Sequence, residues 1–288
     1  MKITIKETPA KTILVKSGLP GTDWVINPYN GCPFACMYCY AAQIARWKHP
    51  NDEWGSYIDV KINAHNLLFQ ELTKLQKKTG TKNFGSIFFS SITDPYNGVE
   101  AKYQLTRKCL GVLSNFGYEG EISILTKSPL ATRDIDIFKK LKNVSVGLTV
   151  TSLDDSVSRF LEVNAPPVTK RIQALSQLHK QGISTYAFVG PMLPYVVKKE
   201  NELEELINTL KQTGVRKIWF EHINLNTRIK ERLFTYLRKT NPSLILLFEK
   251  TKAFVYQKNL DALIHKFMRD HAMKIGGGSV IRHNKPHN

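Results

Sequence analysis

Cysteine is scarce in this sequence, with four residues in 288, which is too few for a disulfide framework in a chain of this length. Three of the four, Cys32, Cys36 and Cys39, nevertheless fall within the fifteen residues NPYNGCPFACMYCYA at positions 27–41. A cluster of cysteines in a chain without a disulfide pattern is typical of metal or redox chemistry in a reducing compartment. The sequence therefore predicts a metal or redox site on this segment.

Long hydrophobic runs are also lacking. No stretch approaches the roughly 18 uninterrupted apolar residues of a membrane span, and no apolar run follows a basic start at the N-terminus. We therefore expect neither a membrane span nor a signal peptide, and we expect the protein to be cytoplasmic.

Acidic residues are few relative to basic ones. Asp and Glu number 24 against 41 Lys and Arg, which gives a formal net charge of +17. Such a balance attracts polyanions, and it favours nucleic acid as a partner. The alternative is a solvated basic surface with no specific partner, because charge alone does not identify a fold or a ligand.

Short apolar runs alternate with helical patterns along most of the chain. Each run is bounded by Gly, Asn, Pro or polar residues, as expected for strands, and the six runs lie at 23–28, 85–91, 121–128, 143–152, 183–191 and 215–223. Helical spacing of leucine and other apolar residues occurs at 63–78, 103–116, 169–182 and 200–214. This alternation predicts a parallel α/β sheet with about six βα units, arranged as a partial (βα)6 TIM-type barrel.

No low-complexity linker divides the chain, so we expect one domain over residues 1–288. Its core covers about residues 20–223, and a helical extension over about 224–288 closes one end. Within that extension, the segment 226–242 is rich in basic residues. They cannot all share one helical face, yet they make one end of the molecule basic and suited to a polyanion: Arg228, Lys230, Arg232, Arg238 and Lys239.

The spacing Cys32-x-x-x-Cys36-x-x-Cys39 follows the first predicted strand, where loops of parallel barrels carry function. A structural zinc site takes four protein ligands, and no second Cys or His pair lies nearby. An iron–sulfur cubane also takes four cysteines, so three would leave one iron open to a small molecule. A zinc or structural-cluster protein without enzymatic activity remains the alternative.

Several segments together resemble one enzyme family. Besides NPYNGCPFACMYCYA they are WGSYIDVKINAHNLL, ITDPYNGVEAKYQLTR, LTKSPLATRDIDIFKKL and VGLTVTSLD, between about residues 10 and 195. The three cysteines with Tyr38 resemble the motif of radical S-adenosylmethionine (SAM) enzymes. The wider pattern resembles their spore photoproduct lyase-like branch, also called DNA repair photolyase-like proteins.

The resemblance implies that the three cysteines hold a [4Fe–4S] cluster whose open iron binds SAM. Reductive cleavage of SAM would give a 5′-deoxyadenosyl radical that abstracts hydrogen from a substrate, with electrons from a low-potential donor such as flavodoxin or ferredoxin. The substrate we expect is a nucleic acid or nucleotide-like molecule. A peptide or small metabolite is the alternative.

Polar residues at the ends of predicted strands are the candidates for holding SAM, because ligands lie at the carboxyl edge of a parallel sheet. Lys127 could meet the SAM carboxylate, and Thr149, Thr151 and Ser152 could reach the ribose. With Tyr38 as an aromatic wall, the predicted cofactor-binding residues are Tyr38, Ser91, Asp94, Lys127, Ser128, Thr149, Ser152 and Glu162. Asp94 and Tyr96 are the predicted catalytic residues, and Tyr96 could relay a radical. For each of them, the plainer interpretation is packing, a solvated loop position or a helix cap.

One departure from the family pattern concerns the loop after the second predicted strand. The resemblance implies a fourth cysteine there, which would return hydrogen to the product radical, but the sequence is FFSSITDPYNG, with Ser91 or Ile92 at that place. This argues against thymine-dimer splitting. The remaining thiol, Cys109, lies at an apolar position of a predicted helix and is predicted to be a buried core residue.

Overall fold

A curved eight-stranded sheet forms the centre of the computed structural model, which describes residues 3–45, 47–197 and 200–283. The strands follow the order β11-β10-β9-β8-β7-β6-β3-β2, and every neighbouring pair is parallel except β2 and β3. Their bounds are β2 Leu14–Lys16, β3 Trp24–Ile26, β6 Ile87–Phe89, β7 Ile122–Thr126, β8 Val144–Thr149, β9 Ser184–Val189, β10 Lys217–Phe220 and β11 Lys274–Ile275. The six predicted strands are thus β3 and β6–β10, and the predicted α/β partial barrel is confirmed.

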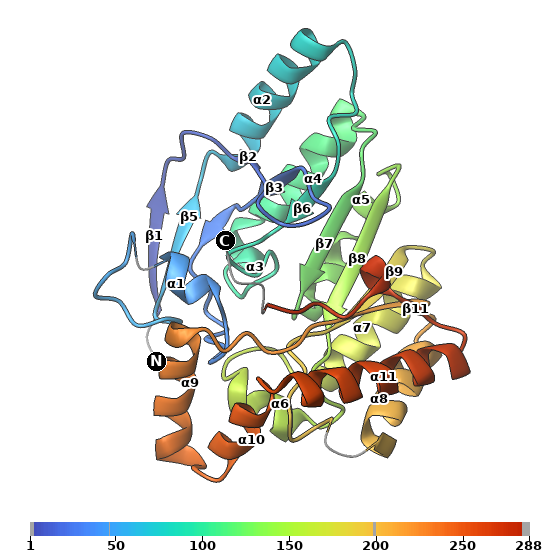
Figure 1. Cartoon of the computed structure of the whole chain (residues 1–288). Helices are drawn as coiled ribbons and strands as arrows, with labels where there is room; N and C mark the ends of the chain where they lie inside the picture. The colour runs from blue at the N-terminus through green and yellow to red at the C-terminus, as the bar shows by residue number, and fades with distance from the viewer. Residues whose placement is uncertain (1–2, 46, 198–199, 284–288) are drawn as a thin grey trace.

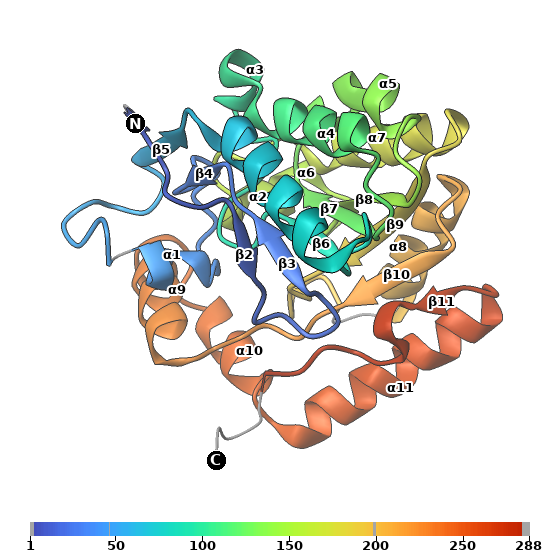
Figure 2. The ribbon, with the colours of Figure 1, turned by 90° about the horizontal axis from the view of Figure 1, so that it is seen from above.

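Helices cover one side of this sheet (Figure 2). The four predicted helices are present as α2 Ala64–Thr79, α4 Leu105–Phe116, α7 Val168–Lys180 and α8 Glu200–Gln212. Apolar residues at intervals of three and four give each one a buried face; Leu68 and Leu72 of α2, for example, are fully buried. Shorter elements complete the loops: α1 Ala41–Ala45, α3 Glu100–Tyr103, η1 Pro129–Asp134, α5 Ile135–Phe138, α6 Asp155–Leu161 and η2 Gly276–Gly278.

A second, three-stranded sheet was not predicted. It consists of β1 (Thr4–Thr8), β5 (Tyr57–Lys61) and β4 (Tyr29–Asn30) in the order β1-β5-β4. Strand β4 pairs antiparallel with β5 and leads directly into the cysteine segment. The small sheet therefore fixes the start of that segment.

The C-terminal region contains three helices, α9 (Thr227–Thr240), α10 (Leu244–Lys250) and α11 (Phe254–Asp270), as expected for a helical extension. They lie together along the lower side of Figure 1. The region also contributes β11, which pairs with β10, and a bridge between Glu221 and Ile281. These strand pairings were not predicted; they join the extension to the sheet. Among the described residues, no helix has the length and apolar character needed to cross a membrane.

Candidate cluster and SAM site

The three cysteines lie on the loop between β4 and α1. Cys32 and Cys36 are buried, Cys39 is half-buried, and all three are free thiols. They belong to one hydrophobic cluster together with Phe34 and Tyr38, the two aromatic residues of the segment. The fold therefore gathers the three sulfur atoms in one partly dry environment.

Gly31 sets the direction of the chain into this loop. Its φ of +86° lies in the left-handed region, and a Cβ at this position would come within 2.6 Å of the Tyr57 carbonyl oxygen. The Gly31 carbonyl in turn accepts a hydrogen bond of 2.5 Å from Thr93 Oγ1. Only glycine combines this backbone conformation with such a close approach to β5.

The far side of the loop is held by the end of α6 and the segment that follows it. Asn164 donates its backbone N–H to the Phe34 carbonyl (3.1 Å) and its side-chain amide to the Pro33 carbonyl (3.0 Å). The Met37 N–H donates to the Leu161 carbonyl at 2.8 Å. Residues more than a hundred positions away thus fix the loop between Cys32 and Cys39.

The surroundings of the thiols fit an anionic iron–sulfur cluster. Backbone N–H groups face two of the sulfurs, from Phe34 toward Cys32 and from Ala41 and Ala42 toward Cys39. The side chains of Lys127, Arg171 and Arg232 supply positive charge close to Cys36. N–H donors and cations are the groups that stabilise thiolates and cluster sulfurs.

Burial raises the pKa of each of the three thiols in the metal-free protein, with a value of about 12 for Cys36. Binding of a metal would therefore release protons. Within the described ranges, no three His, Cys, Asp or Glu side chains converge on a single metal ion. A cubane makes no such demand, because each cysteine binds a different iron.

Glu162 is the centre of a charged group beside the cysteines. This fully buried carboxylate lies 2.6 Å from Arg171 Nη2 through Oε2 and 4.0 Å from Lys127 Nζ through Oε1. Its Oε1 also accepts hydrogen bonds from the Tyr38 hydroxyl and, at 3.2 Å, from Thr151 Oγ1. Burial alone would raise the pKa of Glu162, but Arg171 and Lys127 outweigh it and keep the pKa below its usual range.

Lys127 lies between this carboxylate and the cysteine loop. Its ammonium is 5.7 Å from the centre of the Tyr38 ring. Burial opposes the charged form, yet Glu162 and Cys36 more than compensate, so the pKa of Lys127 is raised. Tyr38, Lys127 and Glu162, three of the predicted cofactor residues, are therefore in contact with one another.

Asp94 is also buried near the cysteines, where its charge acts on Cys32. Its Oδ1 accepts from the Tyr96 N–H (2.9 Å) and Thr126 Oγ1 (2.5 Å), and its Oδ2 accepts from the Lys127 N–H (2.8 Å). Burial raises the pKa of Asp94 despite these donors. Asp94 thereby links the loops after β6 and β7, and its predicted catalytic and cofactor roles stay predictions.

The remaining predicted cofactor residues line the same edge of the sheet. Ser91 Oγ accepts from Asn27 Nδ2 at 3.3 Å, and Thr149 is buried with its carbonyl bound by Arg171. Ser128 caps η1 by accepting the Leu130 N–H, and Ser152 Oγ accepts the Asp154 N–H at 3.0 Å. The plainer interpretation of a cap or turn thus holds for Ser128 and Ser152 in this structure; their binding of a cofactor is untested.

Tyr96 is placed differently. It is fully buried in the main core rather than in the cysteine cluster, and its hydroxyl donates to Asp134 at 3.0 Å. These interactions favour a packing role, and the catalytic role of Tyr96 stays a prediction. Cys109 is likewise fully buried in the main core, as predicted.

Sequence reasoning missed two arginines of the site. Arg171 is fully buried in α7 and holds the Pro166 and Thr149 carbonyls besides Glu162. An arginine on the apolar face that contains Val168 and Leu175 was the available signal. Arg232 of α9 binds the cysteine loop itself, and no local pattern in the sequence indicated this interaction.

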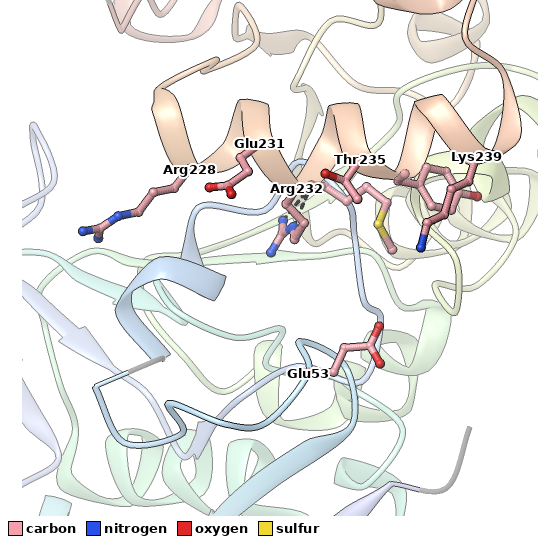
Figure 3. A pocket seen from close by; sticks show the side chains of 8 residues that line it. Glu53, Arg228, Glu231, Arg232, Thr235 and Lys239 are labelled. Carbon is pink, nitrogen blue, oxygen red and sulfur yellow. Dashed lines mark hydrogen bonds between the residues drawn. The ribbon is translucent and has the colours of Figure 1, made fainter.

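An open pocket of about 430 Å³ lies on the outer side of the cysteine loop. Figure 3 shows Arg228, Arg232 and Lys239 along one side of α9, with Glu53 facing them. Met37, which lies between two of the cysteines, also contributes to the wall of the pocket. The pocket therefore joins the basic face of α9 to the loop.

Comparison with known proteins settles the family. The radical SAM superfamily model matches residues 26–213. An uncharacterised protein of Methanocaldococcus jannaschii is 33% identical over 264 residues, which cover 92% of this chain and 93% of that protein. The chain belongs to the radical SAM superfamily. Its predicted family membership is confirmed, and it is a radical SAM enzyme by that membership.

Further relatives and a solved structure are less similar in sequence. An uncharacterised Mycobacterium tuberculosis protein is 25% identical over 252 residues, which cover 84% of this chain and 72% of that protein. The Radical SAM Nalpha-GlyT isomerase of Pseudomonas phage M6 is 24% identical over 65% of this chain and 37% of the phage protein. Spore photoproduct lyase complexed with dinucleoside spore photoproduct superposes with a TM-score of 0.71 at 17% identity, over 97% of this chain and 82% of the lyase. The lyase-like fold predicted from the sequence is thus confirmed.

Proposed function

We propose that this radical SAM enzyme holds a [4Fe–4S] cluster on Cys32, Cys36 and Cys39, binds SAM beside it, and abstracts hydrogen from a nucleic acid or nucleotide-like substrate. The observation that carries the proposal is the gathering of three free, largely buried cysteines next to Lys127 and Glu162. Bound together, the cluster and SAM supply the reductive cleavage that generates an organic radical. The protein's own contribution is to bind, orient and exclude water.

The chain's residues have distinct tasks in this proposal. The Lys127 ammonium attracts the carboxylate of SAM, and Glu162 keeps that ammonium charged and in place. The Tyr38 ring, held through its hydroxyl by Glu162, forms a wall of the site. Phe34 and Leu161, packed in the same cluster, exclude water from the reacting groups.

Two observations support a nucleic-acid substrate. The net charge of +17 favours polyanions, and the lyase of similar fold was solved in complex with a dinucleoside spore photoproduct. Reduction of the cluster requires a low-potential donor, and we infer a flavodoxin or ferredoxin. In the loop after β6, Ser91 or Ile92 stands where the lyase-like pattern implies a hydrogen-donating cysteine, so dimer splitting by that route is not expected.

The test is anaerobic purification and reconstitution with iron and sulfide, followed by incubation with SAM and dithionite. We expect a brown protein with about four irons per chain, as a cubane requires, and production of 5′-deoxyadenosine. Cys36→Ala should lose both, whereas the matched control Cys109→Ala should keep both at a stability cost of about 1 kcal/mol.

Two results would contradict the proposed cluster. A Cys36→Ala protein that kept full iron and still made 5′-deoxyadenosine would refute the proposal, and zinc in place of iron in the wild type would favour the non-enzymatic alternative. Adding DNA, RNA or neither to the same assay tests the substrate class. Stimulation by neither nucleic acid would move the assignment to a peptide or small metabolite.

A further inference from the structure

The side chain of Arg232 reaches from α9 to the backbone of the cysteine loop, nearly two hundred positions away in the sequence. Its Nη2 donates to the carbonyl oxygens of Cys36 (3.0 Å), Met37 (2.7 Å) and Cys39 (2.9 Å). Its Nε donates to the Met37 carbonyl as well, at 2.9 Å. One guanidinium therefore binds three of the four peptide carbonyls between Cys36 and Cys39.

This interaction has a rigid support on the helix side. Ile229 and Leu233 of α9 are buried in the same hydrophobic cluster as Cys32 and Cys36, so the helix packs directly against the loop. The loop itself has no helix or strand between Cys32 and Tyr40. Its conformation depends on outside groups, and Arg232 supplies four hydrogen bonds to the half that carries two cysteines.

The chemistry of the side chain suits this task. Arginine has five donors in a planar fork and stays charged, whereas lysine offers a single rotatable ammonium on a flexible stem. Hydrogen bonds from a charged donor are stronger than neutral ones. The positive charge is also bound to the carbonyls of Cys36 and Cys39 themselves, and thus lies close to two ligands of a cluster.

We propose that Arg232 is a positioning residue of the cluster site. It fixes the Cys36–Cys39 turn in its metal-binding conformation, and its charge favours the reduced, more negative state of a cluster held there. The inference rests on the proposed function, since it concerns the cluster. It also gives the C-terminal helical extension a part in building the site, which the cysteine motif did not indicate.

Three variants test this: Arg232→Gln removes the charge and most of the fork, Arg232→Lys keeps the charge but loses the fork, and Arg238→Gln is the control. Arg238 is exposed on the same helix and has a side chain of the same type. After reconstitution, iron loss to a chelator and the midpoint potential of the cluster are measured. In the iron-free proteins, hydrogen exchange of the peptides covering 33–41 is measured.

Groups that orient metal ligands typically change metal affinity by about 10–100-fold when removed. We therefore expect iron to leave Arg232→Gln roughly 10–100 times faster than wild type, and its potential to become more negative. Arg232→Lys should lose iron at an increased rate but keep a potential near that of wild type, because the charge is retained. Both should show faster exchange in peptides 33–41, and Arg238→Gln should match wild type throughout.

The outcomes distinguish failure of the proposed role of Arg232 from failure of the proposed function. If Arg232→Gln retains iron and potential like wild type, or if its loop exchanges no faster, the role of Arg232 is refuted while the proposed function stands. If wild type takes up no iron, the proposed function fails, and exchange in the iron-free protein still decides whether Arg232 orders the loop. If Arg232→Gln does not fold, Arg232→Lys decides by the same measurements.

Discussion

Glu162 is the residue on which the charges beside the cysteine loop converge, and its energetics follow from its burial. Arg171, its nearest charged partner, is fully buried as well, so neither charge has water to stabilise it. A buried ion pair can be nearly neutral for stability as a whole, but removal of one partner leaves the other charge uncompensated. Both members of the pair are thus needed for the surrounding structure to be stable.

Glu162→Gln tests this directly. It should lower the free energy of unfolding at pH 7 by about 3–5 kcal/mol, because Arg171 then remains buried and charged. The exposed pair of Glu119 and Lys142, 2.9 Å apart, provides the control, and Glu119→Gln should cost at most about 1 kcal/mol. Urea unfolding of both variants measures the difference.

The pH dependence of that loss follows from the lowered pKa of Glu162. A lowered pKa stabilises the fold above the unfolded value, about 4.3 for glutamate, and this stabilisation is lost as the pH falls through the folded value. The gap between wild type and Glu162→Gln should therefore be constant from pH 7 to about 5 and narrow below about 4. A gap that widened on acidification would contradict the assignment.

At the scale of elements, the junction between β4 and the cysteine loop depends on Gly31. Gly31→Ala would place a Cβ 2.6 Å from the Tyr57 carbonyl, in addition to the roughly 1–2 kcal/mol cost of a left-handed alanine. The loop must shift to relieve this clash, so we expect lower iron occupancy after reconstitution and a lower melting temperature. Iron content per chain and thermal unfolding measure the two effects.

Gly80→Ala is the control that separates the steric clash at Gly31 from the cost of a left-handed alanine. Gly80 ends α2 with φ +71°, and a Cβ added there would meet no other atom within 4 Å. Gly80→Ala should therefore lose some stability but no iron. Equal iron content in the two alanine variants would show that the close approach of Gly31 to Tyr57 does not matter for the site.

The elements that sequence reasoning recovered are those with a strong local period. Strands β6–β10 are short apolar runs, and helices α2, α4, α7 and α8 have apolar residues at helical spacing, so both signals lie within a short stretch of sequence. The sheet β1-β5-β4 was missed because β1 is largely exposed, β5 has the charged residue Asp59 at its centre, and β4 has only two residues. Strand β11 has two residues and exists through its pairing with β10.

The residues of the site likewise divide into those with a local signal in the sequence and those without one. Cysteine spacing identified Cys32, Cys36 and Cys39, and strand ends identified Lys127 and Asp94, because both signals are local. Arg232 acts on the loop from nearly two hundred positions away, and Arg171 reaches Glu162 only because α7 packs against the end of α6. Such interactions depend on how the helices pack, which a single sequence does not specify.

At the scale of the whole molecule, the net charge of +17 includes a group of basic residues on α9. The segment 226–242 was predicted to have basic residues on several faces, and the structure agrees: Arg228, Arg232 and Lys239 line the pocket, whereas Lys230 pairs with Glu249 at 2.6 Å. Phe234 of the same helix packs inward. Since Arg232 is engaged with the cysteine loop, a test of polyanion binding must leave it intact.

Reversal of Arg228, Arg238 and Lys239 to Glu tests the nucleic-acid partner at this end. The control reverses Lys74, Lys77 and Lys78, which are exposed on α2 at the opposite end of the molecule and change the net charge equally (Figure 1). Binding to single- and double-stranded DNA and to RNA is measured at several salt concentrations. Wild-type affinity should fall steeply with salt, because each phosphate bound by a basic side chain releases counterions.

If α9 receives the polyanion, its triple variant should bind more weakly, with a salt slope reduced by roughly 2–3, about one for each phosphate that is no longer neutralised. The α2 variant should keep most of the affinity and the slope, since long-range attraction alone is largely screened beyond about 10 Å at 0.1 M salt. Equally weakened binding in the two variants would show that net charge, rather than a site on α9, attracts the polyanion. Undetectable wild-type binding at low salt would instead favour a peptide or small-molecule substrate.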